Sequence, residues 1–157
     1  MNYDFIIYGG GMSSQIAALA LAKDNFNVCF IENPTIKKSD SNLVTFLSQG
    51  SVNYLYGIVD DPNEFNQFAN IEKITCKLAN TNKDSTITFD NEIHSVLGKI
   101  VPNNIIKDVL NSCIKKNKNI EILVKTKSIQ KKMDSKKLSI IVDEQKEIFA
   151  STLLLSV

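Results

Sequence analysis

The chain has 157 residues, of which 43% are hydrophobic, and its 18 basic residues nearly balance 17 acidic ones to leave a net charge of +1. This composition fits one soluble globular domain and argues against disordered, collagen-like and membrane-spanning classes. Because the charge is close to zero, we expect no nucleic-acid partner. The start, Met1-Asn2-Tyr3-Asp4, lacks the basic flank of a signal peptide, which predicts a cytoplasmic chain.

Every basic residue is Lys, so no arginine is available to grip a phosphate or a carboxylate with its planar fork. An anionic ligand must instead be held by backbone N–H groups, lysines or amides. Cys29, Cys76 and Cys113 lack the spacing of a zinc site, and their odd number argues against a disulfide framework. We expect all three to be buried thiols without a chemical role.

The first predicted element is a strand over residues 3–8, because its apolar run is typical of a parallel strand buried on both faces. Gly9-Gly10-Gly11 ends this strand. The segment from Ser13 to Lys23 is rich in Ala and Leu, which predicts a helix with a serine near its start. A second apolar run over residues 28–31 ends at Glu32 and completes a βαβ unit.

Beyond this unit the pattern changes to antiparallel strands. Ser48 is expected to cap a short helix that reaches Tyr56. Residues 71–80 and 85–93 alternate between apolar and polar side chains around a polar turn at 81–84, which predicts an antiparallel hairpin with one face in water. Apolar residues at helical spacing predict a helix over residues 103–116, capped by one of the asparagines at its start.

Residues 98–101 form a short apolar run, and further strands are predicted near residues 120–125, 127–133, 138–143 and 147–155. The last of them contains Leu153-Leu154-Leu155, a run that suits a strand buried on both faces. Since the sequence stops inside this run, we expect the chain to be the N-terminal part of a longer polypeptide. The predicted fold class is α/β, with a Rossmann-like βαβ unit and an inserted antiparallel hairpin.

The motif Gly9-Gly10-Gly11-Met12-Ser13-Ser14 follows a strand and opens a helix, the context in which GxGxxG indicates dinucleotide binding. The first glycine permits a tight turn, the second lets the backbone approach a pyrophosphate, and the third position allows close contact between helix and strand. Ser14 occupies the third position, where its hydroxyl could cap a backbone N–H or meet a phosphate. Glu32, about 20 residues beyond the motif, is placed to accept hydrogen bonds from a ribose. FAD and NAD(P) share an ADP half, so this motif alone does not choose between them.

The antiparallel insertion and three further segments resemble those of FAD-dependent aromatic hydroxylases, the class A flavoprotein monooxygenases. The matching landmarks are YDFIIYGGGMSSQIAALALAK with Glu32, LVTFLSQGSVNYL at 43–55, VLGKIVPNNIIKDVL at 96–110 and the terminal LLLSV. Within that family the chain is most similar to the ubiquinone-biosynthesis branch, of the 2-octaprenyl-6-methoxyphenol hydroxylase type. The resemblance covers nearly the whole chain but only the N-terminal part of such an enzyme.

This resemblance implies an incomplete FAD domain of the glutathione-reductase type. It places residues 1–57 and 103–157 in the dinucleotide-binding layer and residues 71–101 at the start of the substrate-domain β region. It implies FAD as the cofactor and NAD(P)H as the reductant, with FAD bound by Gly9, Gly10, Gly11, Met12, Ser13, Ser14, Glu32 and Gln49. The implied reaction is ring hydroxylation with O2 on a small aromatic or prenylated quinone precursor. The resemblance also allows peripheral contact of the full enzyme with the inner face of the membrane.

The chain departs from the family near the flavin. Leu43 stands close to the position of an arginine that usually contacts the flavin, and Pro102 stands where the family tends to have a polar residue. The Gly-Asp segments that would follow the last strand are absent from the sequence. We therefore expect residues 1–157 by themselves to hold FAD poorly and not to catalyse hydroxylation.

No catalytic side chain and no metal ligand is predicted. His94 has no Ser or Cys partner in a nucleophile motif, and Asp60-Asp61 beside Pro62 is typical of a solvated turn. Two alternatives remain open. One is another flavin-dependent oxidoreductase of the same fold, such as a reductase or an oxidase, and the other is a non-catalytic remnant without a cofactor.

Overall fold

The computed structural model describes residues 2–32, 43–77, 86–90, 96–123, 129–134, 137–142 and 146–156. The chain divides into two compact units, one made of residues 1–40 and 106–157 and the other of residues 41–105. The predicted turn at 81–84 and His94 lie outside the described residues.

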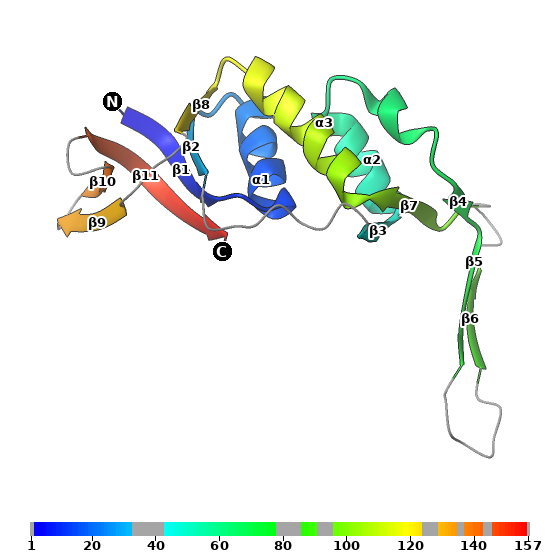
Figure 1. The fold of residues 1–157 in the computed structure, drawn as a ribbon. Helices are drawn as coiled ribbons and strands as arrows, with labels where there is room; N and C mark the ends of the chain where they lie inside the picture. The colour runs from blue at the N-terminus through cyan, green and yellow to red at the C-terminus, as the bar shows by residue number, and fades with distance from the viewer. Residues whose placement is uncertain are drawn as a thin grey trace. The chain divides into compact units, whose positions relative to one another are not determined.

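The first unit is built on a six-stranded sheet with the strand order β8-β2-β1-β11-β10-β9. Its strands are β1 (Asn2–Gly9), β2 (Val28–Glu32), β8 (Ile120–Leu123), β9 (Ile129–Asp134), β10 (Lys137–Val142) and β11 (Lys146–Ser156). The four strands β8, β2, β1 and β11 are parallel, whereas β10 and β9 continue the sheet in antiparallel fashion. Figure 1 shows β1 in the middle of the parallel part, between β2 and β11. The predicted α/β fold with a parallel βαβ unit is confirmed.

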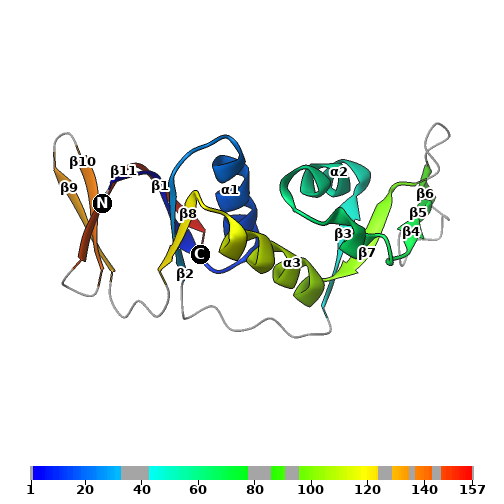
Figure 2. The same ribbon diagram turned by 90° about the horizontal axis from the view of Figure 1, so that it is seen from above.

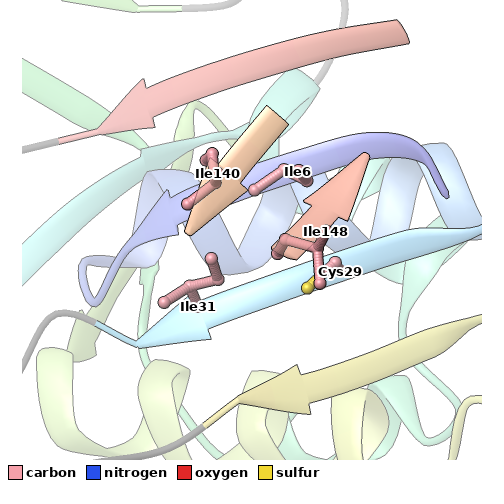
Figure 3. Close-up of a cluster of buried hydrophobic side chains, with 5 residues drawn as sticks. All are labelled: Ile6, Cys29, Ile31, Ile140 and Ile148. Atoms are coloured by element: carbon pink, nitrogen blue, oxygen red, sulfur yellow. The ribbon is translucent and has the colours of Figure 1, made fainter. Parts of the chain in front are cut away.

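The core of this unit forms on both faces of β1, as its apolar run predicts. Ile6 and Ile7 point to opposite faces of the sheet, and both are fully buried. On one face, side chains from four strands point toward one another (Figure 3), namely Ile6, Cys29, Ile31, Ile140 and Ile148. The helix α1 (Met12–Lys23) packs against β1 and β2. Burying an aliphatic side chain of this size stabilises the folded state by roughly 1.5–3 kcal/mol, so the burial of Ile6 and Ile7 stabilises the central position of β1 in the sheet.

The ends of two helices follow the local sequence only in part. The end of α1 is followed by Asn25, whose φ of 66° is left-handed, a conformation that often terminates helices. The helix α3 (Asn103–Lys116) covers the predicted range. Of the two asparagines expected to cap it, Asn104 does not do so. Asn103 Oδ1 accepts a hydrogen bond from Thr45 Oγ1 at 2.6 Å, and Asn104 Oδ1 is buried without a partner among the described residues.

The second unit contains an antiparallel sheet with the order β3-β7-β4, formed by β3 (Val44–Ser48), β7 (Gly98–Pro102) and β4 (Asn70–Ile71). The helix α2 (Gln49–Ile58) lies beside β3 and β7 (Figure 2). It begins at the predicted cap, because Ser48 Oγ accepts a hydrogen bond from the backbone N–H of Ser51 at 3.2 Å. The short 3-10 helix η1 (Pro62–Phe65) is capped in the same way by Asp61, whose carboxylate accepts from the N–H of Asn63 at 3.0 Å.

The predicted hairpin is present as β5 (Lys73–Lys77) and β6 (Thr86–Asp90), which pair in antiparallel fashion. The expectation that one of its faces is buried is wrong for the described residues. Ile87 and Phe89 are 62% and 53% exposed. The physical reason is that these two strands form a sheet of their own and pair with no other strand that the structure describes.

Two other burial predictions are corrected. Cys29 and Cys113 are buried as expected, but Cys76 on β5 is exposed. At the end of β11, Leu154 and Leu155 are 37% and 64% exposed, so this part of the strand is not buried on both faces. In both places the strand has the expected apolar residues, but no element that the structure describes covers them.

The packing groups residues 43–58 with the second unit, because β3 pairs with β7 and α2 contacts both strands. The packing does not show whether residues 1–57 contribute to dinucleotide binding, so their assignment to a dinucleotide-binding layer stays a prediction. None of the helices in the described ranges has the combined length and apolar character that spanning a bilayer requires.

Candidate dinucleotide-binding site

The glycine-rich turn lies at the carboxyl ends of the parallel strands. Gly9, the last residue of β1, is paired with Glu32 on β2 and with Ser156 on β11. From β1 the chain moves first to β2 and β8 on one side and later returns to β11 on the other side. Open α/β sheets bind ligands outside the carboxyl ends of their strands at such a point of reversal. The register therefore places the turn and Glu32 together where a nucleotide is expected.

Gly9 sits where three elements approach one another closely. A Cβ at Gly9 would lie 2.5 Å from the carbonyl oxygen of Ser156 and 2.9 Å from Cβ of Ser14. Both distances are too short for a real side chain, and the nearest atom belongs to the backbone, which cannot simply rotate away. Only glycine lets β1, β11 and α1 meet in this arrangement. The close contact between strand and helix is thus made by Gly9 against Ser14.

Gly11 presents the opposite surroundings. A Cβ at Gly11 would meet no heavy atom within 4 Å of it among the described residues. Gly11 is also the N-cap residue of α1, and this helix start has neither a side-chain cap nor an acidic residue in its first turn. A helix N-terminus with open space beside it can bring backbone N–H groups and the positive end of the helix dipole to an anion. These features fit the pyrophosphate of a dinucleotide.

The Ser14 side chain holds the first turn together. It is 1% exposed, and its Oγ donates a hydrogen bond to the carbonyl oxygen of Gly11 at 2.7 Å. The hydroxyl therefore bonds to a backbone carbonyl rather than capping an N–H. Of the two preceding residues, Met12 is half-buried and Ser13 is exposed.

Glu32 ends β2 with an exposed side chain. Its partner in the register of the two strands is Gly9, so its carboxylate belongs to the same edge of the sheet as the glycine turn. An ionised carboxylate only accepts hydrogen bonds, which suits the two hydroxyl groups of a ribose.

Three residues expected near the flavin belong to the second unit, so their place in one site with the glycine turn stays a prediction. Gln49 is the first residue of α2, and its Nε2 donates to Asn53 Oδ1 at 2.9 Å. Leu43 precedes β3 and is 53% exposed. Pro102 ends β7 opposite Val44.

Sequence reasoning missed a buried amide pair behind the turn. Gln15 is 4% exposed, and its Nε2 donates to Asn111 Oδ1 on α3 at 2.6 Å. Gln15 Oε1 is buried without a partner in the described part of the chain. The available signal was a glutamine in the first turn of a helix that otherwise consists mostly of Ala and Leu. The pair links the start of α1 to α3.

A hollow of about 300 Å³ lies at the amino ends of β1 and β2 and is therefore remote from the glycine turn. In its wall Tyr3 Oη donates to Glu121 Oε2 at 2.5 Å. Burial, and then this hydrogen bond, raise the pKa of Tyr3 above its ordinary range, so the phenol stays protonated. Within the described ranges no cluster of His, Cys, Asp and Glu side chains could hold a metal ion.

No family model matches the chain, and no curated protein matches it in sequence. Solved structures nevertheless share its fold. One is PqsL, a probable FAD-dependent monooxygenase from Pseudomonas aeruginosa, with a TM-score of 0.73 and 11% identity over 98% of this chain and 42% of that one. Another is p-nitrophenol 4-monooxygenase PnpA from Pseudomonas putida DLL-E4, with a TM-score of 0.69 and 14% identity over 99% of this chain and 41% of that one.

A third similar structure is a geranylgeranyl bacteriochlorophyll reductase-like protein from Thermoplasma acidophilum. Its TM-score is 0.68 and its identity 16%, over 99% of this chain and 39% of that one. The chain thus has an α/β fold that is also found in FAD-dependent monooxygenases, and it spans about two-fifths of the length of these three proteins.

Proposed function

We propose that the chain is the FAD-binding part of a flavin-dependent monooxygenase that hydroxylates an aromatic ring with NAD(P)H and O2. The observation that carries this proposal is the position of Gly9 between Glu32 and Ser156, with the uncapped start of α1 beside it. The likeness of the fold to PqsL and PnpA supports the reaction class. A prenylated quinone precursor as the substrate, and with it a role in ubiquinone biosynthesis, is supported only by the sequence resemblance.

The residues of the turn have distinct tasks in this function. The backbone N–H groups at Gly10, Gly11 and the first turn of α1 hold the pyrophosphate, and Glu32 accepts hydrogen bonds from the ribose. When bound, FAD supplies the electron transfer and the activation of O2, which no side chain of the turn can provide. The protein binds and orients the cofactor. Because Leu43 carries no charge, it gives the flavin ring no guanidinium contact.

FAD titration tests the binding part of this function. Charge-assisted hydrogen bonds are worth roughly 1.5–3 kcal/mol, so Glu32→Ala should weaken FAD binding by about 10- to 100-fold. The matched control is Glu72→Ala, which removes an exposed glutamate in the second unit and should leave the affinity unchanged. Equal affinities in all three proteins would remove Glu32 from the site. A wild-type chain that binds no FAD at any concentration would instead support a remnant without a cofactor.

A flavin-dependent reductase is the second candidate, and the likeness to the geranylgeranyl bacteriochlorophyll reductase-like protein favours it. The two reactions differ in their need for oxygen. A monooxygenase consumes O2 and NAD(P)H together and places one oxygen atom in the product, whereas a reductase delivers electrons to its substrate under anaerobic conditions. Product formation by a complete, FAD-loaded enzyme that contains this chain, measured with and without O2, therefore separates the two candidates.

A further inference from the structure

The helix α1 is built mostly from small side chains. Alanine and serine together make up half of its 12 residues. The side chains that form ridges on a helix surface set its angle and its position against a neighbouring element, and small side chains form only shallow ridges. Directional contacts are therefore needed to fix where α1 begins relative to the sheet that it covers.

Two asparagines hold α1, one near each of its ends. Near the start, Asn111 Oδ1 on α3 accepts the hydrogen bond from Gln15 Nε2 at 2.6 Å. Near the end, Asn119, which lies between α3 and β8, donates from its Nδ2 to the carbonyl oxygen of Ala22 at 3.2 Å. Both asparagines are half-buried. The two bonds are therefore comparable in kind but act on opposite ends of the same helix.

The hydrogen bond at the start of α1 carries a cost for stability. Gln15 is 4% exposed, and its Oε1 is buried without a partner among the described residues. An unpaired buried acceptor offsets what the bond from Nε2 contributes to the free energy of unfolding. What the amide adds over an apolar side chain is direction, because a buried hydrogen bond fixes the relative position of the two groups that it joins.

Gln15 is also the residue that closes the first turn of α1. Its backbone N–H donates to the carbonyl oxygen of Gly11 at 3.2 Å, which is the first hydrogen bond within the helix. The N–H groups of residues 11–14 precede this bond and have no acceptor inside the helix. The attraction of a helix N-terminus for an anion falls off within one turn, so it depends on where this turn stands. The Gln15 side chain anchors the turn to α3.

We propose that the hydrogen bond between Gln15 and Asn111 positions the first turn of α1 for nucleotide binding. It sets where the free N–H groups of residues 11–14 meet the pyrophosphate. This inference rests on the proposed function, because it concerns a nucleotide held at the glycine turn. Gln15 acts through the backbone of the turn and is a positioning residue rather than a ligand contact.

An ADP titration of the full chain, followed by NMR, tests this positioning with a matched pair of variants. Asn111→Ala and Asn119→Ala each remove one amide that bonds to α1, at its start and at its end respectively. Asn111→Ala should weaken ADP binding by about 3- to 10-fold, and Asn119→Ala should leave it unchanged. If wild type binds ADP and the two variants lose equal affinity, or neither loses any, this inference alone fails. A wild-type chain that binds no ADP would overturn the proposed function and this inference together.

An exchange of the two amides gives a rescue that a loss of folding could not imitate. Gln15→Asn shortens one side chain by a methylene group and Asn111→Gln lengthens the other by the same group, so the double variant keeps the combined reach. Each single variant should bind ADP more weakly than wild type, and the double variant should recover most of the lost affinity. A double variant whose loss equals the sum of the two single losses would contradict the proposal.

Hydrogen exchange of the ligand-free chain provides a readout without any nucleotide. The amide of Gln15 reports on the first turn of α1, and the amide of Asp24, which donates to the carbonyl oxygen of Ala20, reports on its end. Asn111→Ala should speed exchange at Gln15 more than at Asp24, and Asn119→Ala should do the reverse. Equal acceleration at both amides in both variants would show that Asn111 stabilises the fold as a whole and does not position the turn.

Discussion

At the scale of single residues, the two outer glycines of the turn meet different requirements. Gly9 is enclosed, with the Ser156 carbonyl oxygen 2.5 Å from where a Cβ would stand, whereas the same position on Gly11 is open. A side chain at Gly9 therefore disturbs the fold, and a side chain at Gly11 disturbs only what approaches the turn. The sequence motif predicts that both positions are glycine but does not separate these reasons, because the enclosure of Gly9 comes from β11, far along the chain.

Gly9→Ala and Gly11→Ala are expected to act on different properties. Overpacking at Gly9 should lower the free energy of unfolding by about 1–3 kcal/mol. Gly11→Ala should change it by less than about 0.5 kcal/mol, because a φ of −87° suits any residue, while FAD binding weakens. Urea unfolding and FAD titration of both variants measure the two effects. Equal losses of stability would show that the space beside Gly11 is not open.

Two substitutions of Ser14 test whether its hydroxyl stabilises the fold or contacts the cofactor. Ser14→Ala removes the hydrogen bond to the Gly11 carbonyl oxygen and should lower the free energy of unfolding by about 0.5–1.5 kcal/mol. Ser14→Gly should leave FAD affinity unchanged or improve it, because it frees space for the close approach of helix and strand. A loss of affinity of about tenfold in either variant would show that the hydroxyl contacts the cofactor.

At the scale of elements, the positions of strands and helix caps depend on neighbouring residues and could be predicted from the sequence. The burial of a strand face depends on elements far away in the sequence and could not. The strands at residues 2–9 and 28–32 and the cap at Ser48 follow from local apolar runs and local hydrogen bonding. The exposure of β6 and of the end of β11 depends on which element packs against them, and periodicity carries no information about that. For the same reason, Gln15 could be noticed in the sequence but not paired with Asn111.

The start of α2 offers a direct test of capping. Ser48→Ala removes the acceptor of the Ser51 N–H and should lower the free energy of unfolding by about 0.5–2 kcal/mol. Ser13→Ala changes an exposed serine in the first turn of α1 and serves as the control for the loss of a hydroxyl. Chemical denaturation of both variants gives the comparison. If the two losses are equal, the Ser48 cap contributes nothing specific.

The hydrogen bond between Gln15 and Asn111 predicts which of two substitutions destabilises the protein more. Asn111→Ala leaves the buried Nε2 of Gln15 unpaired and should cost about 1–3 kcal/mol. Gln15→Leu removes this donor together with the unpartnered Oε1, so it should be the less destabilising of the two changes. Thermal unfolding of both variants and of the double variant measures this order, and the reverse order would contradict a buried amide bond between the two helices.

At the scale of the whole molecule, the chain consists of two compact units with separate features. The first carries the glycine turn and Glu32, and the second carries α2 and the exposed hairpin. The fold could be predicted from the order of strands and helices. The choice of ligand could not be made from the glycine motif, because FAD and NAD(P) present the same ADP half to such a turn.

The most direct test is a titration of the full chain with ADP, followed by amide chemical shifts in NMR spectra. ADP, and FAD through its ADP half, should shift the amides of residues 9–14 and of Glu32 in a saturable manner. Riboflavin, which lacks the ADP half, should leave these amides unchanged, and Glu32→Gln should weaken the response to ADP. Shifts confined to other parts of the chain, or no saturable shift with either ADP or FAD, would contradict nucleotide binding at the glycine turn.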